Sequence, residues 1–409
     1  MNATVQTAAS APTEQPGTNA AAIAMYCGLL ASYSLMAADR YLFPVLAPDV
    51  RRQFGFSLAT TGALSTIFTL GLGIGGLPTG YLLSRFSRKT VLLTGIAIFS
   101  SGIAATTIAT GFWSMFVCLA VTGVGMAMEA TGMFALAASY FVKYRGAAVG
   151  SVNLCYGVGG IYGPILASTL LAAYSTWRAP MIAFGAAGFV FIALIAVAVR
   201  PWFSETRRAA EAKNDEGGAA TLANRNTILL TLLSIVHGLV LYGYLGMYPT
   251  FLRESLHYDP KTAGFVMSFF GLGAMLSIAG GWLGDKLSPR AVLGSAFVLS
   301  AGLGYLFFHG SEAVVTKAIL SFTYGVVGSA VLYVNLAACH VKAVRSRIAS
   351  RASGMFVTSL YASSAAAGSV MGWLADQAGW ALAGAIQMSL LSVVGAALAV
   401  ALEPKDMSL

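Results

Sequence analysis

The chain has 409 residues, of which 57% are hydrophobic and 10% are charged. A soluble domain needs a largely polar surface, so this composition excludes a soluble fold and makes lipid the solvent for much of the surface. The formal net charge of +9 resides mainly in short loops between apolar runs. No basic stripe with interleaved aromatics occurs, so nucleic acid is not an expected partner.

The first twenty residues carry no Lys or Arg, which excludes a secretory n-region and predicts a disordered tail at 1–20. The four cysteines lie inside apolar stretches, without the spacing of metal ligands. We therefore expect neither a disulfide framework nor a metal or other cofactor. These cysteines are Cys27, Cys118, Cys155 and Cys339.

Apolar runs separated by charged or Pro/Gly breaks predict an all-α polytopic membrane protein with twelve transmembrane helices. A hydrocarbon core of about 30 Å is crossed by about 20 apolar residues in a helix, and such stretches recur along the chain. The first six are expected at 21–46, 57–83, 90–109, 112–140, 147–173 and 179–199. The second six are expected at 227–252, 262–284, 290–308, 313–340, 352–376 and 380–402.

These spans predict two six-helix bundles, at 21–199 and 227–402, with a short tail at 403–409. The linker at 200–226 contains SETRRAAEAKNDEGGAA, which is too charged to enter a membrane. This stretch forms either a surface amphipathic helix or a solvated loop.

Lys and Arg are concentrated in the linker and in the loops after predicted helices 2, 4, 8 and 10. By the positive-inside rule these segments face the cytoplasm, and an even number of spans then places both termini there. The expected location is the bacterial inner membrane, with lipid around a monomer.

An internal repeat connects the two halves, because GYLLSRFSRK at 80–89 recurs in form as GWLGDKLSPR at 281–290. Each copy follows the second predicted helix of its half. These residues resemble the loop signature of the major facilitator superfamily, although Ser84 and Ser87 replace its Asp and second Gly. The resemblance covers the whole helical region and implies the twelve-helix fold of that superfamily and transport by alternating access.

The resemblance also implies a conformational latch, in which basic side chains at helix ends hold one conformation closed. The alternative is that these residues only anchor the chain by the positive-inside rule. The residues concerned are Gly80, Arg85, Arg88, Lys89, Gly281, Asp285, Lys286 and Arg290.

Three charged residues lie within predicted spans: Asp39 and Arg40 in the first helix and Glu129 in the fourth. A charge inside a membrane costs several kcal/mol unless it is paired or hydrated, so these side chains are expected to face a cavity. A carboxyl group there could load and release protons, which assigns proton coupling to Asp39 and Glu129. Arg40 could bind a substrate carboxylate. The alternative is a permanent structural ion pair.

The Asp39-Arg40 pair resembles the anion:cation symporter family, and similar pairs occur in the spinster family. Glu129 lies about one turn later than the helix 4 Glu of that pattern, and the helix 4 Arg is missing, with Thr122 nearby. This resemblance implies proton-coupled symport of a small organic anion.

Further polar and aromatic residues lie in predicted spans, and the superfamily's architecture implies that helices 1, 4, 7 and 10 line the cavity. Each is a candidate substrate contact, and for each the alternative is packing or an interfacial aromatic. In addition to Arg40, the candidates are Asn153, Tyr156, His237, Tyr242, Asn335 and Tyr361.

Other functions fit the sequence less well. No metal-spaced His/Cys set, nucleophile elbow or P-loop occurs, so neither an enzyme nor an ATP-driven pump is expected. Gly159, Gly163 and Pro164 resemble a helix 5 signature often linked to exporters, although close helix packing accounts for them equally. The alternative to symport is therefore proton-coupled efflux of a drug or metabolite.

Overall fold

The computed structural model describes residues 20–141, 145–205, 218–345 and 348–407. Residues 1–19 of the predicted tail at 1–20, and most of the charged linker run, 206–217, lie outside these described residues. Within the described ranges the regular structure is helical, apart from one isolated β-bridge between Ala219 and Val344.

The helices of the first half extend from α1 to α8, and α9 follows them in the linker. Their bounds are α1 (Ala20–Asp39), α2 (Leu42–Phe54), α3 (Leu58–Thr66), α4 (Phe68–Arg85), α5 (Arg88–Thr106), α6 (Phe112–Tyr140), α7 (Arg145–Tyr174), α8 (Arg178–Ala198) and α9 (Pro201–Ser204).

The second half extends from α10 to α17 and contains two π-helical segments, η1 and η3. The bounds are α10 (Arg225–Glu254), α11 (Pro260–Ala274), α12 (Ser277–Lys286), α13 (Pro289–His309), α14 (Val314–Tyr324), η1 (Gly325–Tyr333), α15 (Val334–Lys342), α16 (Ala349–Gly384), η3 (Ala385–Leu390), α17 (Leu391–Val400) and the short 3₁₀ turn η4 (Pro404–Asp406).

These helices make twelve membrane crossings within the described residues. Ten stretches are long and apolar enough to span a membrane, and α11 with α12, bent by 41° at their junction, makes an eleventh. One of the ten, Arg351–Val400, has 50 residues, whereas a crossing needs about 20. Gly379 interrupts it with a φ of 80°, which only glycine adopts readily, so this stretch crosses twice. The predicted fold class is confirmed.

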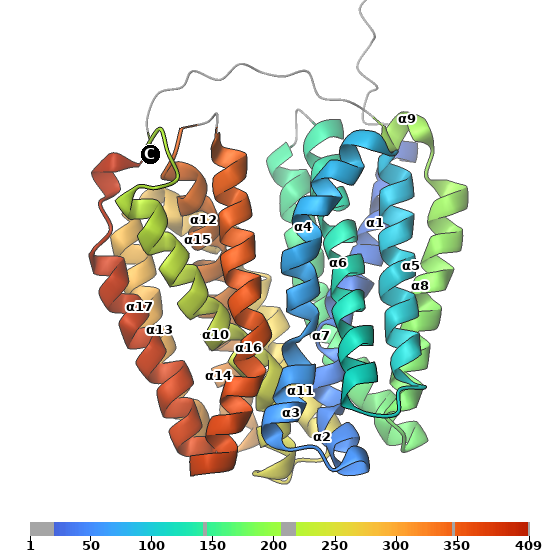
Figure 1. Cartoon of the computed structure of the whole chain (residues 1–409), viewed down its shortest axis with the longest axis vertical. Helices are drawn as coiled ribbons and strands as arrows, with labels where there is room; N and C mark the ends of the chain where they lie inside the picture. The colour runs from blue at the N-terminus through green and yellow to red at the C-terminus, as the bar shows by residue number, and fades with distance from the viewer. Residues whose placement is uncertain (1–19, 142–144, 206–217, 346–347, 408–409) are drawn as a thin grey trace, which may run out of the picture.

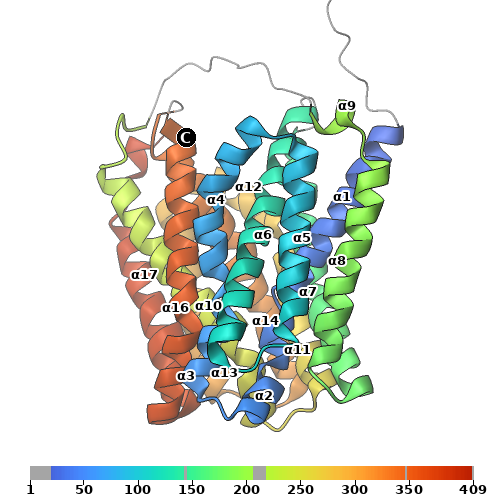
Figure 2. The ribbon, with the colours of Figure 1, turned by 45° about the vertical axis from the view of Figure 1, so that its right-hand side comes forward.

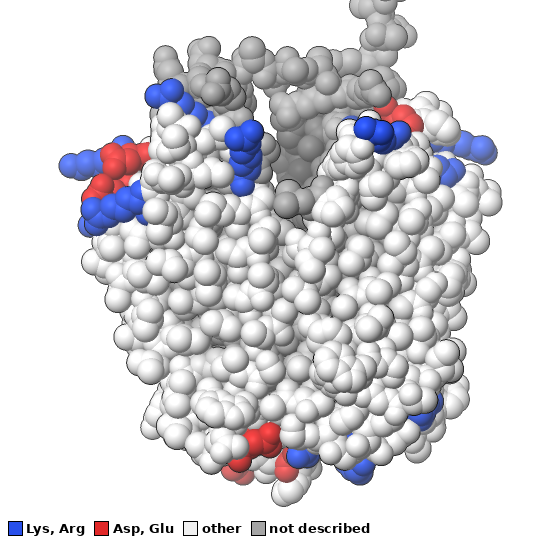
Figure 3. Space-filling model, in the orientation of Figure 1, with Lys and Arg blue, Asp and Glu red and all other residues white. Residues whose placement is uncertain are grey.

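The long helices of the two halves stand side by side and run between two opposite faces (Figures 1 and 2). We call the face that carries α9 and the end of α17 the linker face, and the face that carries the α2–α3 connection the far face. In the view of Figure 3 the charged side chains gather at these two faces and leave an uncharged band between them. Such a band is the surface that a bilayer covers.

The two halves are in close contact on the far-face side. A Cβ on Gly62 of α3 would lie 1.9 Å from the carbonyl oxygen of Gly368 in α16. Similarly, a Cβ on Gly271 of α11 would lie 2.3 Å from the carbonyl carbon of Gly160 in α7. Only glycine permits backbones to approach this closely, so the two halves pack tightly against each other at both contacts.

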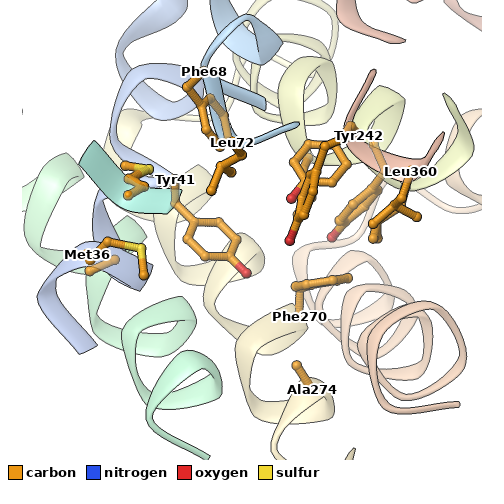
Figure 4. Close-up of a cluster of buried hydrophobic side chains, with 14 of the residues drawn as sticks. Met36, Tyr41, Phe68, Leu72, Tyr242, Phe270, Ala274 and Leu360 are labelled. Atoms are coloured by element: carbon orange, nitrogen blue, oxygen red, sulfur yellow. The ribbon is translucent and has the colours of Figure 1, made fainter. Parts of the chain in front are cut away.

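Aromatic side chains fill the space between the halves beside these contacts (Figure 4). Tyr41 and Phe270 approach from opposite halves, with ring centroids 6.4 Å apart, and Phe68 meets Tyr242 at 6.1 Å. Tyr41 and Phe270 are almost fully buried. We call these four side chains, Tyr41, Phe68, Tyr242 and Phe270, the aromatic floor. The aromatic floor separates the centre of the molecule from the far face.

The first predicted helix, 21–46, is broken toward its end, at Arg40 and Tyr41, between α1 and α2. Pro44 explains the position of the break, because proline has no N–H to donate to the carbonyl of the residue four positions earlier, which is Arg40. The first turn of α2 is therefore separated from the last turn of α1, with Arg40 at the junction.

The repeated loops make equivalent contacts in the two halves. Lys89 Nζ donates hydrogen bonds to the carbonyl oxygens of Ala196 and Val199 at the end of α8, at 2.7 Å each. Arg290, at the same position in the second copy, donates through Nε to the carbonyl of Leu402 just after α17, at 3.2 Å. A cation at a helix C-terminus offsets the free carbonyls and the helix dipole. The sequence repeat is thus also a structural repeat.

Candidate functional site

A cavity of about 610 Å³ lies between the two halves, within the size range of small-molecule sites. Its lining reaches Val341 and Ser353, near the linker-face ends of α15 and α16, and Figure 3 shows a hollow between the halves at this face. The polar residues in its lining are Tyr33, Arg40, Thr131, Asn153, Tyr156, Tyr242, Ser277, Ser329, Tyr333, Ser353, Thr358 and Tyr361.

Arg40 lies in this cavity among aromatic side chains from both halves. Its Nη1 donates to the Tyr361 hydroxyl at 3.5 Å, and its guanidinium carbon lies 5.2 Å from the ring centroid of Tyr156. Tyr33 and Tyr242 also interact electrostatically with the guanidinium. Arg40 is only 8% exposed, so its charge is held in surroundings with little water.

No carboxylate of the described residues lies within 4.0 Å of the Arg40 side chain, and its Nε has no hydrogen-bond partner there. Asp39, although adjacent in sequence, is on another side of the helix, since successive residues are turned by about 100°. It lies beside Thr122 and Met126 in the interior of the first half, outside the lining of the large cavity, in a small pocket that Arg40 also lines. Its buried Oδ1 has no partner among the described residues.

Glu129 is buried between α6 and α1, outside the cavity lining. Its Oε1 accepts a hydrogen bond from Ser32 Oγ at 2.7 Å, and its Oε2 is buried without a partner in the described part of the chain. Ser32 and Asp39 are seven residues apart and therefore share one face of α1. The two acids thus lie about two helical turns apart along one helix interface, outside the lining of the substrate-sized cavity but within electrostatic reach of Arg40.

The cavity brings together five of the seven residues expected to bind substrate: Arg40, Asn153, Tyr156, Tyr242 and Tyr361. His237 and Asn335 lie outside its lining.

Both residues make other contacts within the second half. His237 is buried in α10 with its ring 6.3 Å from that of Phe297. Asn335 Nδ2 donates to the carbonyls of Gly280 at 3.0 Å and Val331 at 2.8 Å, and the bond to Gly280 ties α15 to α12. The side of its helix on which each residue lies determines whether it lines the cavity. The polarity of a residue alone does not reveal that side.

Sequence reasoning missed Tyr33 and Tyr333, which both line the cavity. Helical spacing could have identified Tyr33, because it precedes Arg40 by seven residues and so shares its face of the helix. Tyr333 lies at the end of the π-helical segment η1, and its hydroxyl is 3.3 Å from that of Tyr361. A π-helical insertion changes the direction of the residues after it, so regular spacing does not predict this position.

The residues of the first expected latch make contacts within the first half. The backbone N–H groups of Arg88 and Lys89, at the start of α5, donate to the Glu205 carboxylate at 2.9 and 3.2 Å. The guanidinium of Arg85 lies over the ring of Tyr81, at 4.8 Å. Gly80 is exposed near the end of α4.

The second loop behaves in the same way within its own half. Asp285 forms an ion pair with Lys342 at 3.0 Å, which joins α12 to α15. Gly281 packs next to Val334, and Lys286 is exposed.

Ion pairs between the halves occur instead on the far face. Arg51 of α2 contacts Glu254 of α10 at 2.8 Å, and Arg253 of α10 pairs with Asp49 of α2. Arg253 is nearly buried, whereas Arg52, which also contacts Asp49 at 3.6 Å, is largely exposed. These two pairs join α2 to α10 and close the far face beyond the aromatic floor.

The motif in the fifth predicted helix has a packing role. A Cβ on Gly159 would lie 2.4 Å from the carbonyl oxygen of Ser34, and one on Gly163 would lie 2.7 Å from that of Ala38. Both glycines therefore let α7 approach the backbone of α1.

Comparison with known proteins agrees with the fold described above. A family model described as the Major Facilitator Superfamily matches residues 29–369. The chain is 28% identical over 334 residues to the 3-(3-hydroxy-phenyl)propionate transporter of Escherichia coli K12, covering 78% of this chain and 80% of that protein. It is 22% identical over 299 residues to the 4-hydroxybenzoate transporter PcaK of Pseudomonas putida, covering 64% of this chain and 65% of that protein. The match thus spans slightly under two thirds of that relative.

Solved structures show the same fold at low sequence identity. A bacterial homologue of the human lysosomal transporter Spinster, in an inward-facing conformation, superposes with a TM-score of 0.74 at 16% identity, covering 94% of this chain and 96% of that one. The nucleoside transporter NupG superposes with a TM-score of 0.75 at 15% identity, covering 92% and 99%. At such identities the likeness concerns the fold alone.

Proposed function

The chain belongs to the major facilitator superfamily of membrane transporters, and from this premise we propose that it carries a small organic anion across the membrane together with protons. The observation that carries the proposal is the environment of Arg40. It is a buried cation that faces a substrate-sized cavity, and no carboxylate of the described residues lies within 4.0 Å of it, although Asp39 and Glu129 interact with its charge at longer range.

An anionic substrate would supply the missing partner. Removing a guanidinium from water is costly unless a counter-charge or hydrogen bonds replace the water. A carboxylate fits the planar fork of Arg through two parallel hydrogen bonds. The relatives named above are transporters of aromatic carboxylates, and the gallate transporter of Pseudomonas putida, 24% identical over 313 residues, is another. Their names support an organic anion as the cargo here.

Asp39 and Glu129 are the proposed proton carriers. Each has a buried oxygen with no partner among the described residues. A carboxylate in that situation is costly, and taking up a proton removes the cost. Since both acids lie outside the cavity lining but interact electrostatically with Arg40, we propose that they act through Arg40 and movement of its junction, without touching the substrate.

The charge distribution supports a cytoplasmic linker face. The end of α4 and the start of α5 lie at this face, as do the start of α13 and the end of α15. These helix ends carry the basic residues Arg85, Arg88, Lys89, Arg290 and Lys342. By the positive-inside rule the linker face is cytoplasmic, and the first and last α-helices of the described chain, α1 and α17, begin and end on this side. The structure then corresponds to an inward-open conformation, with the far face closed by α2 and α10.

Proteoliposomes loaded with a pH-sensitive dye test this function. With 3-hydroxybenzoate as the probe and the pH lower outside than inside, we expect accumulation that a protonophore abolishes, accompanied by acidification of the lumen. Arg40→Ala liposomes provide the matched control. Proton movement opposite to that of the probe would replace symport by the efflux alternative. Absence of any 3-hydroxybenzoate movement above the control would contradict the anion proposal.

A further inference from the structure

Arg40 is the only charged side chain in the lining of the large cavity, as far as the structure describes the chain. A substrate with one negative charge would be neutralised by it. A second negative charge on the substrate would face hydroxyls and hydrocarbon without a counter-ion, in surroundings where charge is strongly disfavoured. The cavity therefore selects against dianions.

Aromatic rings from both halves form the walls beside Arg40. In the first half Tyr33 packs edge-to-face on Phe134, with centroids 6.3 Å apart. In the second half Tyr242 packs edge-to-face on Tyr361, with centroids 6.1 Å apart. Aromatic groups favour such offset and edge-to-face contacts with one another, so these walls favour a flat aromatic body.

A row of hydroxyls leads away from the cation. The Tyr361 hydroxyl lies 3.5 Å from Arg40 Nη1 and 3.3 Å from the Tyr333 hydroxyl. Each phenol hydroxyl has one donor and two acceptor positions, of which Tyr361 uses two in these contacts and Tyr333 one, so Tyr333 retains more capacity for another partner. The ring of Tyr333 is held by Phe356, with centroids 5.4 Å apart, so the position of this hydroxyl is fixed.

We infer that the substrate is an aromatic monocarboxylate with a ring hydroxyl, and that Tyr333 is the specificity-determining residue that recognises this hydroxyl. The inference rests on the anion transport proposed above and adds the charge, the shape and the second polar contact of the substrate. The carboxylate lies on Arg40, the ring lies between the aromatic walls, and the ring hydroxyl bonds to Tyr333. A hydroxyl at ring position 3 or 4 is available for this, whereas one at position 2 bonds to its own carboxylate.

The test is a competition series against uptake of radiolabelled 3-hydroxybenzoate in proteoliposomes. The competitors are 3- and 4-hydroxybenzoate, benzoate, cyclohexanecarboxylate and benzene-1,3-dicarboxylate. We expect one of the hydroxybenzoates to compete best, benzoate about tenfold less well, and the dicarboxylate least, because a recognised hydroxyl contributes more than a matching shape.

Tyr333→Phe removes only the hydroxyl and keeps the ring on Phe356. This variant should bind the preferred hydroxybenzoate about tenfold more weakly and benzoate unchanged, so that the preference between the two disappears. Tyr305→Phe is the matched control, because Tyr305 is exposed and stacks on His309 outside the cavity. A purely structural role of Tyr333 would weaken both ligands equally.

The outcomes separate the two proposals. Equal competition by the dicarboxylate or the cyclohexane acid, or an unchanged hydroxyl preference in Tyr333→Phe, would overturn the inference and leave anion transport intact. If none of the five carboxylates bound the wild-type protein, as judged also by thermal stabilisation, both the inference and the proposed function would fail.

Discussion

Arg40 donates a hydrogen bond to the hydroxyl of Tyr361, although 321 residues separate them and they belong to opposite halves of the molecule. The binding cavity is therefore shared: the cation comes from the first half, and the hydroxyl row comes from the second. Relative movement of the halves must break or remake this contact. A ligand bound between them thus interacts differently with each conformation, which is the requirement for coupling binding to alternating access.

Glu129→Gln should abolish proton-driven accumulation and leave exchange of substrate across the membrane largely intact. The amide keeps the shape and the hydrogen bond to Ser32 but cannot change charge, and exchange does not require the proton to cycle. The measurement compares uphill uptake with counterflow in the same proteoliposomes.

Ser32→Ala is the matched control for Glu129, since it removes the partner and retains the carboxyl group. It should change the pH dependence of uptake without abolishing accumulation. Uphill uptake by Glu129→Gln at wild-type rates across the pH range would show that Glu129 has only a structural role.

Charge reversal at the far face should impair transport. Arg253→Asp places two acids together between α2 and α10 and should lower the uptake rate at least tenfold, because the closed far face is lost. The double variant Asp49→Arg/Arg253→Asp restores opposite charges and should recover most of the rate. Recovery of this kind reports a direct interaction.

Arg52→Ala is the control for that pair, because Arg52 contacts Asp49 only within α2 and is largely exposed. It should change the uptake rate less than twofold. A double variant as slow as Arg253→Asp alone would show that the pair does not hold the far face closed.

Lys89→Ala and Arg290→Ala should each lower the free energy of unfolding by about 1 kcal/mol, since each removes a cation that caps the last helix of its half. The two effects should add, because the sites are distant and share no partner. Thermal unfolding of the purified variants measures this, with exposed Lys286→Ala as the control. Loss of transport without loss of stability would support the latch interpretation instead.

The linker face should be cytoplasmic. In a cysteine-free background, Ala223→Cys, exposed beside α10, should react with an impermeant maleimide only after the cells are permeabilised. Ser311→Cys, exposed in the connection between α13 and α14 at the opposite end, should react in intact cells. The reverse pattern of labelling would invert the proposed topology.

Much of the fold could be predicted from the sequence because each helix that crosses a bilayer needs about 20 mostly apolar residues. The predicted span 112–140 coincides with α6, and 179–199 differs from α8 by one residue at each end. The break at Arg40 was missed, although Pro44 marks it. An apolar run reports that a segment crosses the membrane, and it does not report where backbone hydrogen bonds are lost.

The site could be predicted only in part, because the direction in which each side chain points was missing. Arg40 was identified because a charged side chain inside a membrane has a high free-energy cost, and it lines the cavity. Asp39 shares that cost but points elsewhere, since neighbours on a helix are turned by about 100°. His237 and Tyr242 lie on the same helix α10, and only Tyr242 faces the cavity. The rotation of each helix follows from packing, which a single sequence does not contain.

Binding of 3-hydroxybenzoate to purified Arg40 variants tests the central claim most directly. Isothermal titration measures the affinity and thermal unfolding verifies the fold, on the wild-type protein, Arg40→Lys and Arg40→Ala. Lys keeps the charge but loses the planar fork, so Arg40→Lys should bind about tenfold more weakly, and Arg40→Ala should bind weaker still. Both variants should unfold cooperatively. Wild-type affinity in a well-folded Arg40→Ala protein would contradict the account and favour efflux of neutral or cationic compounds.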